Sequence, residues 1–201
     1  MKTLLTLLSL FLLSLGVGLS IYAYHNMDSL TLPRSLSLLP GEAAASPDDW
    51  QTYTNDGYGF TLTHPPGYVV DEAQQNGVLF SPPAGAISDT NLSSDTGLIV
   101  GRYPGTTGEC SPKLFASGVK TVTRTTENGV TYLVATTTGS GAGSTYEQVI
   151  YALPNSNPCV SVAYLIHATA IGNYTAGSVR AYNRAALLDD FDKMRRSLVL
   201  R

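Results

Sequence analysis

The side chains in this sequence that are best suited to chemistry are two cysteines and three histidines. Cys110 and Cys159 are the only cysteines, and the histidines are His25, His64 and His167. Metal sites and catalytic pairs that a sequence reveals directly have their ligands a few residues apart. The three histidines are too far apart to pair locally, so we predict no catalytic, cofactor-binding or metal-ligating residue from spacing alone.

We predict that Cys110 and Cys159 form a disulfide bond. The uncharged N-terminal run leads us to expect that the domain faces an oxidising compartment, and each cysteine lies at the boundary of an expected element. A closed loop of about 50 residues stabilises a fold by about 4 kcal/mol in the chain-entropy account. Two alternatives are weaker. A two-cysteine metal site has only Glu109 as an adjacent ligand, and a redox-active pair lacks the Cys-x-x-Cys spacing.

His64 and His167 lie at the ends of two expected strands, and we interpret both as structural. The alternative is a hydrolase or metal-dependent enzyme whose site gathers distant residues such as His64, His167 and Glu109. The glycine-rich segment GSGAGS at 139–144 supports no such site. It joins two expected strands, unlike a nucleophile elbow, and it lacks the lysine of a phosphate-binding loop.

The composition argues against a nucleic-acid partner. Charged residues make up only 13% of the chain, and the formal net charge is -3. A domain that binds nucleic acid needs a clustered basic face. The one adjacent basic pair, Arg195-Arg196, has acidic neighbours that dilute it.

The N-terminal run from residue 3 to residue 24 is uncharged and follows only Lys2 and the amino terminus. At about 1.5 Å per residue it is long enough for a hydrocarbon core of about 30 Å. The positive charge ahead of it directs the rest of the chain out of the cytoplasm. We therefore predict an N-terminal transmembrane helix within residues 1–25, which anchors an extracytoplasmic domain in the membrane. Cleavage near Ser20 is the alternative, and it would release a secreted protein.

Residues 26–48 are predicted to be a tether, because prolines and small residues interrupt any helical period. Residues 49–201 are predicted to be one domain rich in strands. In residues 58–64, apolar and small polar residues alternate with a period of two, and we expect this strand to form a hairpin with residues 77–83. Further strands are expected at 97–103, 128–139, 144–154 and 158–168.

The segment 158–168 is apolar on both faces, so it is expected to be central and covered on both sides by helices or loops. One short helix is expected at 111–118, with serine as its cap and proline at its first position. A longer helix is expected at 182–198, capped by Asn183, with an apolar stripe at helical spacing. Its aspartates are expected to face solvent and its two arginines to complement the helix dipole. Residues 197–201 then return as a last strand.

The stretch NDGYGFTLTHPPGY resembles the start of PsbP-type domains, which have a polar turn, Gly-Phe, an extended run, proline and an aromatic residue. These positions are Asn55, Gly59-Phe60, Pro65-Pro66 and Tyr68 in this chain. The resemblance covers roughly residues 50–201. It implies an α+β fold, an α/β/α sandwich around a central antiparallel sheet. The family usually has tryptophan where Tyr68 stands, and the anchor and the cysteine pair are further departures, so photosystem binding does not carry over.

These observations predict a membrane-tethered, extracytoplasmic binding or assembly module of the cell envelope. It is expected to be non-enzymatic, to need no cofactor and to dock to a cell-envelope protein partner. The enzyme assembled from distant residues is the alternative, and several polar side chains converging in a deep pocket would favour it.

Overall fold

The computed structural model describes residues 49–74, 77–105 and 108–201. The expected anchor, residues 1–25, and nearly all of the expected tether, residues 26–48, lie outside the described residues. Everything described belongs to a single compact unit. Within this part of the chain, no helix has the length and apolar character needed to cross a membrane.

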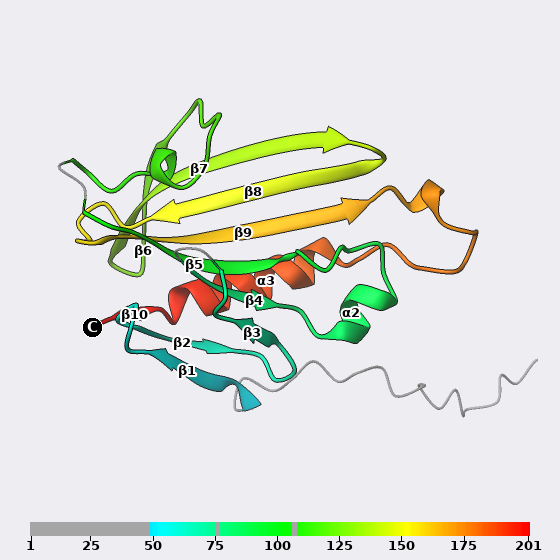
Figure 1. The fold of residues 1–201 in the computed structure, drawn as a ribbon, viewed down its shortest axis with the longest axis horizontal. Helices are drawn as coiled ribbons and strands as arrows, with labels where there is room; N and C mark the ends of the chain where they lie inside the picture. Colours follow the sequence, from blue (N-terminus) through cyan, green and yellow to red (C-terminus); the bar gives the residue numbers. More distant parts are fainter. Residues whose placement is uncertain (1–48, 75–76, 106–107) are drawn as a thin grey trace, which may run out of the picture. The chain divides into compact units, whose positions relative to one another are not determined.

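The described residues form a seven-stranded antiparallel sheet and a smaller three-stranded antiparallel sheet (Figure 1). The fold is therefore α+β with a central antiparallel sheet, as predicted. The expected central strand does lie in the middle of the larger sheet. In spatial order the larger sheet consists of β3 (Val69–Asp71), β4 (Gly77–Ser81), β5 (Gly97–Tyr103), β9 (Cys159–Thr169), β8 (Ser144–Ala152), β7 (Val130–Gly141) and β6 (Thr123–Glu127).

Two tight turns join the strands at one edge of the larger sheet. Asn128-Gly129 joins β6 to β7, and Ala142-Gly143 joins β7 to β8, with positive φ at all four residues. Two-residue hairpin turns with positive φ match the natural twist of antiparallel strands. The Asn128-Gly129 pair therefore forms the turn of a β-hairpin.

The smaller sheet corrects the first predicted strand pairing. Strand β2 (Phe60–His64) pairs with β1 (Gln51–Asn55) and β10 (Val199–Leu200), whereas β4 pairs with β3 and β5. The turn after Asn55 reverses the chain, because Asn55 accepts bonds from the backbone N–H groups of Tyr58 and Gly59. That turn brings β1 onto β2 and leaves β4 to pair elsewhere. The predicted return of the C-terminus as a strand is confirmed by β10.

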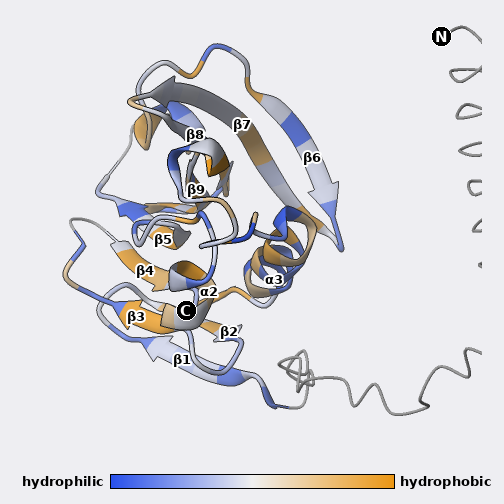
Figure 2. Cartoon of the chain, turned by 90° about the vertical axis from the view of Figure 1, so that its right-hand side faces the viewer, coloured by the Kyte–Doolittle hydropathy of each residue, from blue (hydrophilic) through white to orange (hydrophobic). Residues whose placement is uncertain are grey.

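Helix α3 (Arg184–Arg196) lies on one face of the larger sheet, close to β6 and β2 (Figure 2). Asn183 caps it as predicted, since its Oδ1 accepts a hydrogen bond from the backbone N–H of Ala186 at 3.2 Å. The face of the sheet toward α3 carries the main core. Its buried members include Phe60, Leu62, Val78, Phe80, Leu98, Val100, Val162, Tyr164, Ile166, Leu187, Phe191 and Met194.

Arg195, predicted to complement the helix dipole, has a further role inside the domain. It is only 2% exposed and lies in the core. Its Nε donates to the hydroxyl of Tyr164 at 2.8 Å, and its Nη2 donates to Glu127 at 2.7 Å. The guanidinium also lies 4.2 Å from the ring centroid of Tyr151. A charged side chain can be buried where other residues bind its charged group. Here residues of β6, β8 and β9 contact the guanidinium.

Asp192, which was predicted to face solvent, is half-buried and accepts bonds from Tyr164 and Arg195. The pKa of Tyr164 is raised above its ordinary value, because burial disfavours the phenolate. Tyr164 therefore stays a hydroxyl that donates to Asp192 and accepts from Arg195. The aspartate therefore links the helix to the sheet and does not only face solvent.

The opposite face of the larger sheet, which we call the second face, is covered differently. The segment 108–122 lies over one end of it, and Leu114, Phe115 and Val122 pack there against residues of β7, β8 and β9. The helix expected at 111–118 is only a 3-10 turn, Pro112–Leu114, and Ser111 makes no side-chain cap bond. The disulfide and the packing of Phe115, and not helical propensity, fix the conformation of this segment. Within the described residues, loop covers only this end of the second face and no α-helix packs on it, so the helix layer that an α/β/α sandwich implies is absent from this side.

Two short helical segments complete the described fold. They are α2 (Ala84–Ser88) and the 3-10 turn η4 (Ile171–Asn173). The backbone after α2 is tied to the end of β9, because Asn91 exchanges hydrogen bonds with Thr169. This connection leads directly to the loop that carries Asp95.

Candidate functional site

A groove of about 550 Å³ lies on the second face, beyond the segment 108–122. Its apolar side chains come from three neighbouring strands, Leu79 on β4, Ile99 on β5 and Leu165 on β9. They share one face because side chains alternate along a strand and ladder partners face the same way. Glycine at position 97 is required here, since a Cβ would lie 2.6 Å from Leu79 Cδ1. Leu79 therefore lies over Gly97 and forms part of the groove.

A row of polar side chains continues this surface. Leu165 pairs with Gln148, and Gln148 pairs with Thr137, so an amide and a hydroxyl follow the leucine across β9, β8 and β7. Gln74, ahead of β4, and Ser117, in the segment 108–122, complete the polar lining. The groove therefore combines an apolar part with uncharged hydrogen-bonding groups.

The next row across the same strands holds His167 on β9, Tyr146 on β8 and Gly139 on β7. The His167 and Tyr146 rings are stacked, with centroids 4.2 Å apart and planes 28° apart. Gly139 has open space where a side chain would lie. His167 thus covers one face of the Tyr146 ring. Gly139, the neighbour of Tyr146 on β7, leaves the other face uncovered.

Asp95 holds the histidine from the loop before β5. The carboxylate oxygens lie 2.7 Å and 3.0 Å from His167 Nδ1. Neighbouring Thr96 fixes this loop, because its hydroxyl donates to the carbonyl of His167 at 3.0 Å and accepts from the N–H of His167 at 3.1 Å. The aspartate is thereby positioned by the backbone of the residue that it contacts.

The arrangement leaves His167 poorly placed for proton transfer. Nδ1 is engaged by Asp95, and Nε2 is buried without a hydrogen-bond partner among the described residues. A general base has to reach its substrate with a free ring nitrogen. In this geometry His167 instead supports the ring of Tyr146.

Among the described lining residues, Asp95 supplies the charged side chain on the groove face. Glu147 alternates with Tyr146 and Gln148 on β8, so its side chain lies on the α3 side, where its two carboxylate oxygens accept from Arg184 at 2.6 Å and 3.2 Å. No lysine or arginine is among the described residues that line the groove. Its chemistry therefore does not favour an anionic ligand.

The residues of the predicted enzyme alternative are not brought together. His64 is buried on the α3 side of the sheet, where its ring contacts Phe80 and its Nδ1 lies 2.9 Å from the carbonyl oxygen of Pro65. His167 lies on the second face. Glu109 forms an ion pair with Arg124. Glu109 precedes the cysteine bonded to the start of β9, and His167 lies eight residues along that strand, about 26 Å away at about 3.3 Å per residue.

His25 lies outside the described residues. In the part of the chain that the structure describes, no three histidine, cysteine, aspartate or glutamate side chains gather as a metal site would require.

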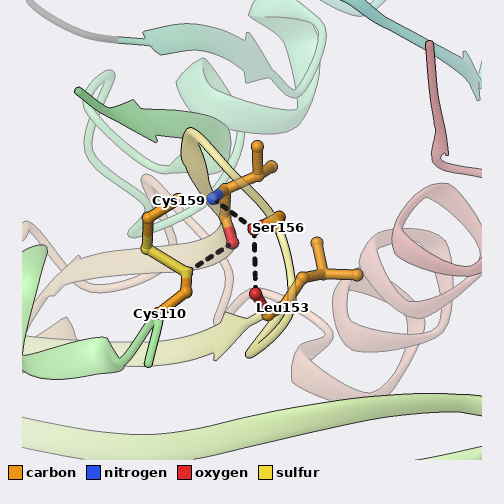
Figure 3. Close-up of a disulfide and its surroundings, with 5 residues drawn as sticks. Cys110, Leu153, Ser156 and Cys159 are labelled. Atoms are coloured by element: carbon orange, nitrogen blue, oxygen red, sulfur yellow. Dashed lines mark hydrogen bonds between the residues drawn. A yellow bond between two sulfur atoms is a disulfide. The ribbon is translucent and has the colours of Figure 1, made fainter. Parts of the chain in front are cut away.

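The predicted disulfide between Cys110 and Cys159 is present, with a Cα–Cα distance of 5.0 Å (Figure 3). Both cysteines are buried. The adjoining β8–β9 loop is closed by Ser156, which donates to the carbonyl of Leu153 and accepts from the N–H of Val160, both at 2.8 Å. The disulfide attaches the segment 108–122 to this closed loop and thereby fixes one end of the groove.

Sequence analysis missed most of the groove. The alternation of residues 144–154 was sufficient to place Tyr146 and Gln148 on one face of a strand. It did not show that this face stays open. Asp95 lies 72 positions before its partner histidine, and no local pattern marks it.

Comparisons with known proteins assign this chain to no family. No protein-family model matches the chain, and no curated protein matches its sequence. Among solved structures it is similar to a Bacteroides thetaiotaomicron protein, at a TM-score of 0.47 and 9% identity over 76% of this chain. It spans about half, 49%, of that protein. It is also similar to the Saccharomyces cerevisiae Ran-binding protein Mog1p, at a TM-score of 0.47 and 10% identity, over 75% of this chain and 95% of Mog1p.

Proposed function

We propose that this chain is a membrane-tethered, extracytoplasmic binding module of the cell envelope. Residues 1–25 anchor it, residues 26–48 are the tether, and residues 49–201 form a PsbP-like domain. The domain binds through the groove on the second face. Its partner belongs to the envelope, and nucleic acid is not a ligand.

The groove is the observation that carries this proposal. It combines an apolar part, a polar row and a supported aromatic ring, the mixture that ligand sites use for affinity and orientation. Its volume lies within the range of small-ligand sites, about 300–1,000 Å³. Among the described residues, no α-helix covers the second face.

The geometry favours binding over catalysis. An acid–base or metal-dependent enzyme needs its groups at one reacting atom. His64 and His167 lie on opposite faces of the sheet, and the nitrogens of His167 are engaged or covered. The buried disulfide supports export, because such bonds persist in oxidising compartments.

Site-specific photo-crosslinking in intact cells tests the proposal. A photoreactive residue at Thr137, in the groove, is expected to give a discrete crosslinked product in the envelope fraction. The same residue at exposed Thr52 on β1 is the matched control and is expected to give none. Equal products from both positions, or a Thr137 product confined to the cytoplasmic fraction, would contradict the proposal.

A further inference from the structure

We infer that the groove binds a neutral carbohydrate chain, with the open face of Tyr146 as the platform on which a sugar ring stacks. This inference rests on the proposed binding function and specifies its ligand class. Three observations carry it: the support of Tyr146, the hydrogen-bonding groups around it, and the absence of positive charge among the described lining residues.

Tyr146 is a fixed platform, although it is 46% exposed. His167 stacks against one ring face, and Asp95 and Thr96 hold that histidine in place. Gly139 pairs with Tyr146 from β7, on the side away from His167, and has no side chain that could cover the ring. A rigid, amphipathic aromatic face presented to a groove suits the C–H face of a sugar ring.

The groups around the platform match the hydroxyls of a sugar, each of which both donates and accepts hydrogen bonds. The side chain of Asp95 is 65% exposed, and its oxygens keep lone pairs beyond those facing His167. Gln148 and Gln74 offer amide donors and acceptors, and Thr137 and Ser117 offer hydroxyls.

Charge and backbone geometry argue against other ligands. A phosphate or an acidic glycan would need lysine or arginine, and none is among the described lining residues. A peptide that adds a strand needs an unpaired sheet edge. Here the groove lies on the face of paired strands, whose backbone groups are already bonded. A neutral, hydroxyl-rich chain fits these constraints.

Direct binding to the full chain in lipid nanodiscs tests the inference. The probes are short neutral oligomers of glucose, mannose and N-acetylglucosamine, followed by saturation-transfer NMR and calorimetry. At least one of them is expected to bind. Tyr146→Ala is expected to weaken that binding roughly tenfold or more, as for a central aromatic anchor, whereas Tyr146→Phe is expected to retain it.

Tyr103→Ala is the matched control, because Tyr103 is 40% exposed and lies outside the groove lining. It is expected to leave binding unchanged. Gly139→Val is a second, independent variant. The position has open space for a side chain, so the fold should tolerate it, and the added methyl groups should cover the ring and weaken binding.

Several results would overturn the inference. Binding that survives both Tyr146→Ala and Gly139→Val would do so. If no neutral oligomer binds while the Thr137 crosslink still forms in cells, the carbohydrate inference fails and the binding function stands. Loss of the crosslink as well would remove both. A Thr137 crosslink to residues 26–48 of the same chain, or to a second copy, would assign the groove to those occupants instead.

Discussion

The two faces of the seven-stranded sheet are covered in different ways. On one face, α3 and β2 enclose aromatic and aliphatic side chains and a buried arginine. On the second face, a disulfide-linked loop covers one end and a groove occupies the rest. The same strands supply both faces, so alternate residues of one strand serve different purposes.

The difference assigns the fold and the proposed function to different faces: residues on the α3 side stabilise the fold, and residues on the second face form the proposed binding groove. On the α3 side, even the ionisable groups have partners and act as structural links. On the second face, a histidine and an aspartate form a pair that supports a half-exposed ring. Substitutions on the first face should therefore change stability, and substitutions in the groove should change binding.

The largest effect is expected from removing the disulfide with Cys110→Ala and Cys159→Ala together. The bond closes a sequence separation of 49 residues, so its loss should lower the free energy of unfolding by about 4 kcal/mol in the chain-entropy account. Urea unfolding of the full chain, followed by near-ultraviolet circular dichroism, measures this. The oxidised and reduced wild-type chains are the controls. A loss below about 1 kcal/mol would show that packing alone holds the segment 108–122.

Arg195→Met is expected to cost about 3 kcal/mol of unfolding free energy. Breaking a buried ion pair costs about 3–5 kcal/mol, and the lower end applies because Glu127 and Asp192 are partly exposed. Arg196→Met is the matched control on the same helix, and it should cost less than about 0.5 kcal/mol. Equal losses from the two variants would mean that the buried cluster contributes no more than a surface charge.

Neighbouring residues of β9 compare the two faces directly. Ile166 is buried on the α3 side, whereas Leu165 is only partly buried in the groove. Ile166→Ala should cost about 3 kcal/mol, because it leaves a cavity in a closed core. Leu165→Ala should cost about 1 kcal/mol, because solvent already reaches its side chain. Thermal or urea unfolding of both variants measures the difference, and a larger loss at Leu165 would reverse the assignment of the faces.

The smallest effect concerns Asp190 on α3. Burial raises the pKa of its carboxyl above the ordinary value. The folded state therefore binds this proton more tightly than the unfolded state, so this group's contribution to stability falls as pH rises through the acid range. Asp190→Asn should remove that pH dependence and raise neutral-pH stability by less than about 1 kcal/mol.

Urea unfolding between acid and neutral pH measures the Asp190 effect, with exposed Asp89→Asn as the control. If Asp190→Asn leaves the pH dependence of stability unchanged, burial of this carboxylate has no energetic consequence.

The sequence by itself determined the local features of this protein. The apolar run of residues 158–168 predicted the central strand, and Asn183 predicted the start of α3. These features depend on neighbours a few residues apart, which a sequence displays directly. The disulfide also followed from the sequence, because a chain with two cysteines has one possible intramolecular pair.

Only the tertiary structure decided which distant residues meet. It paired β2 with β1 and β10, buried Arg195 among tyrosines and brought Asp95 to His167 across 72 positions. Strand order and loop placement minimise the free energy of the whole domain, and no short window of sequence contains that information. The open second face has the same origin. The segment 111–118 has the signals of a helix, yet the disulfide and Phe115 hold it as a loop that leaves a groove beside it.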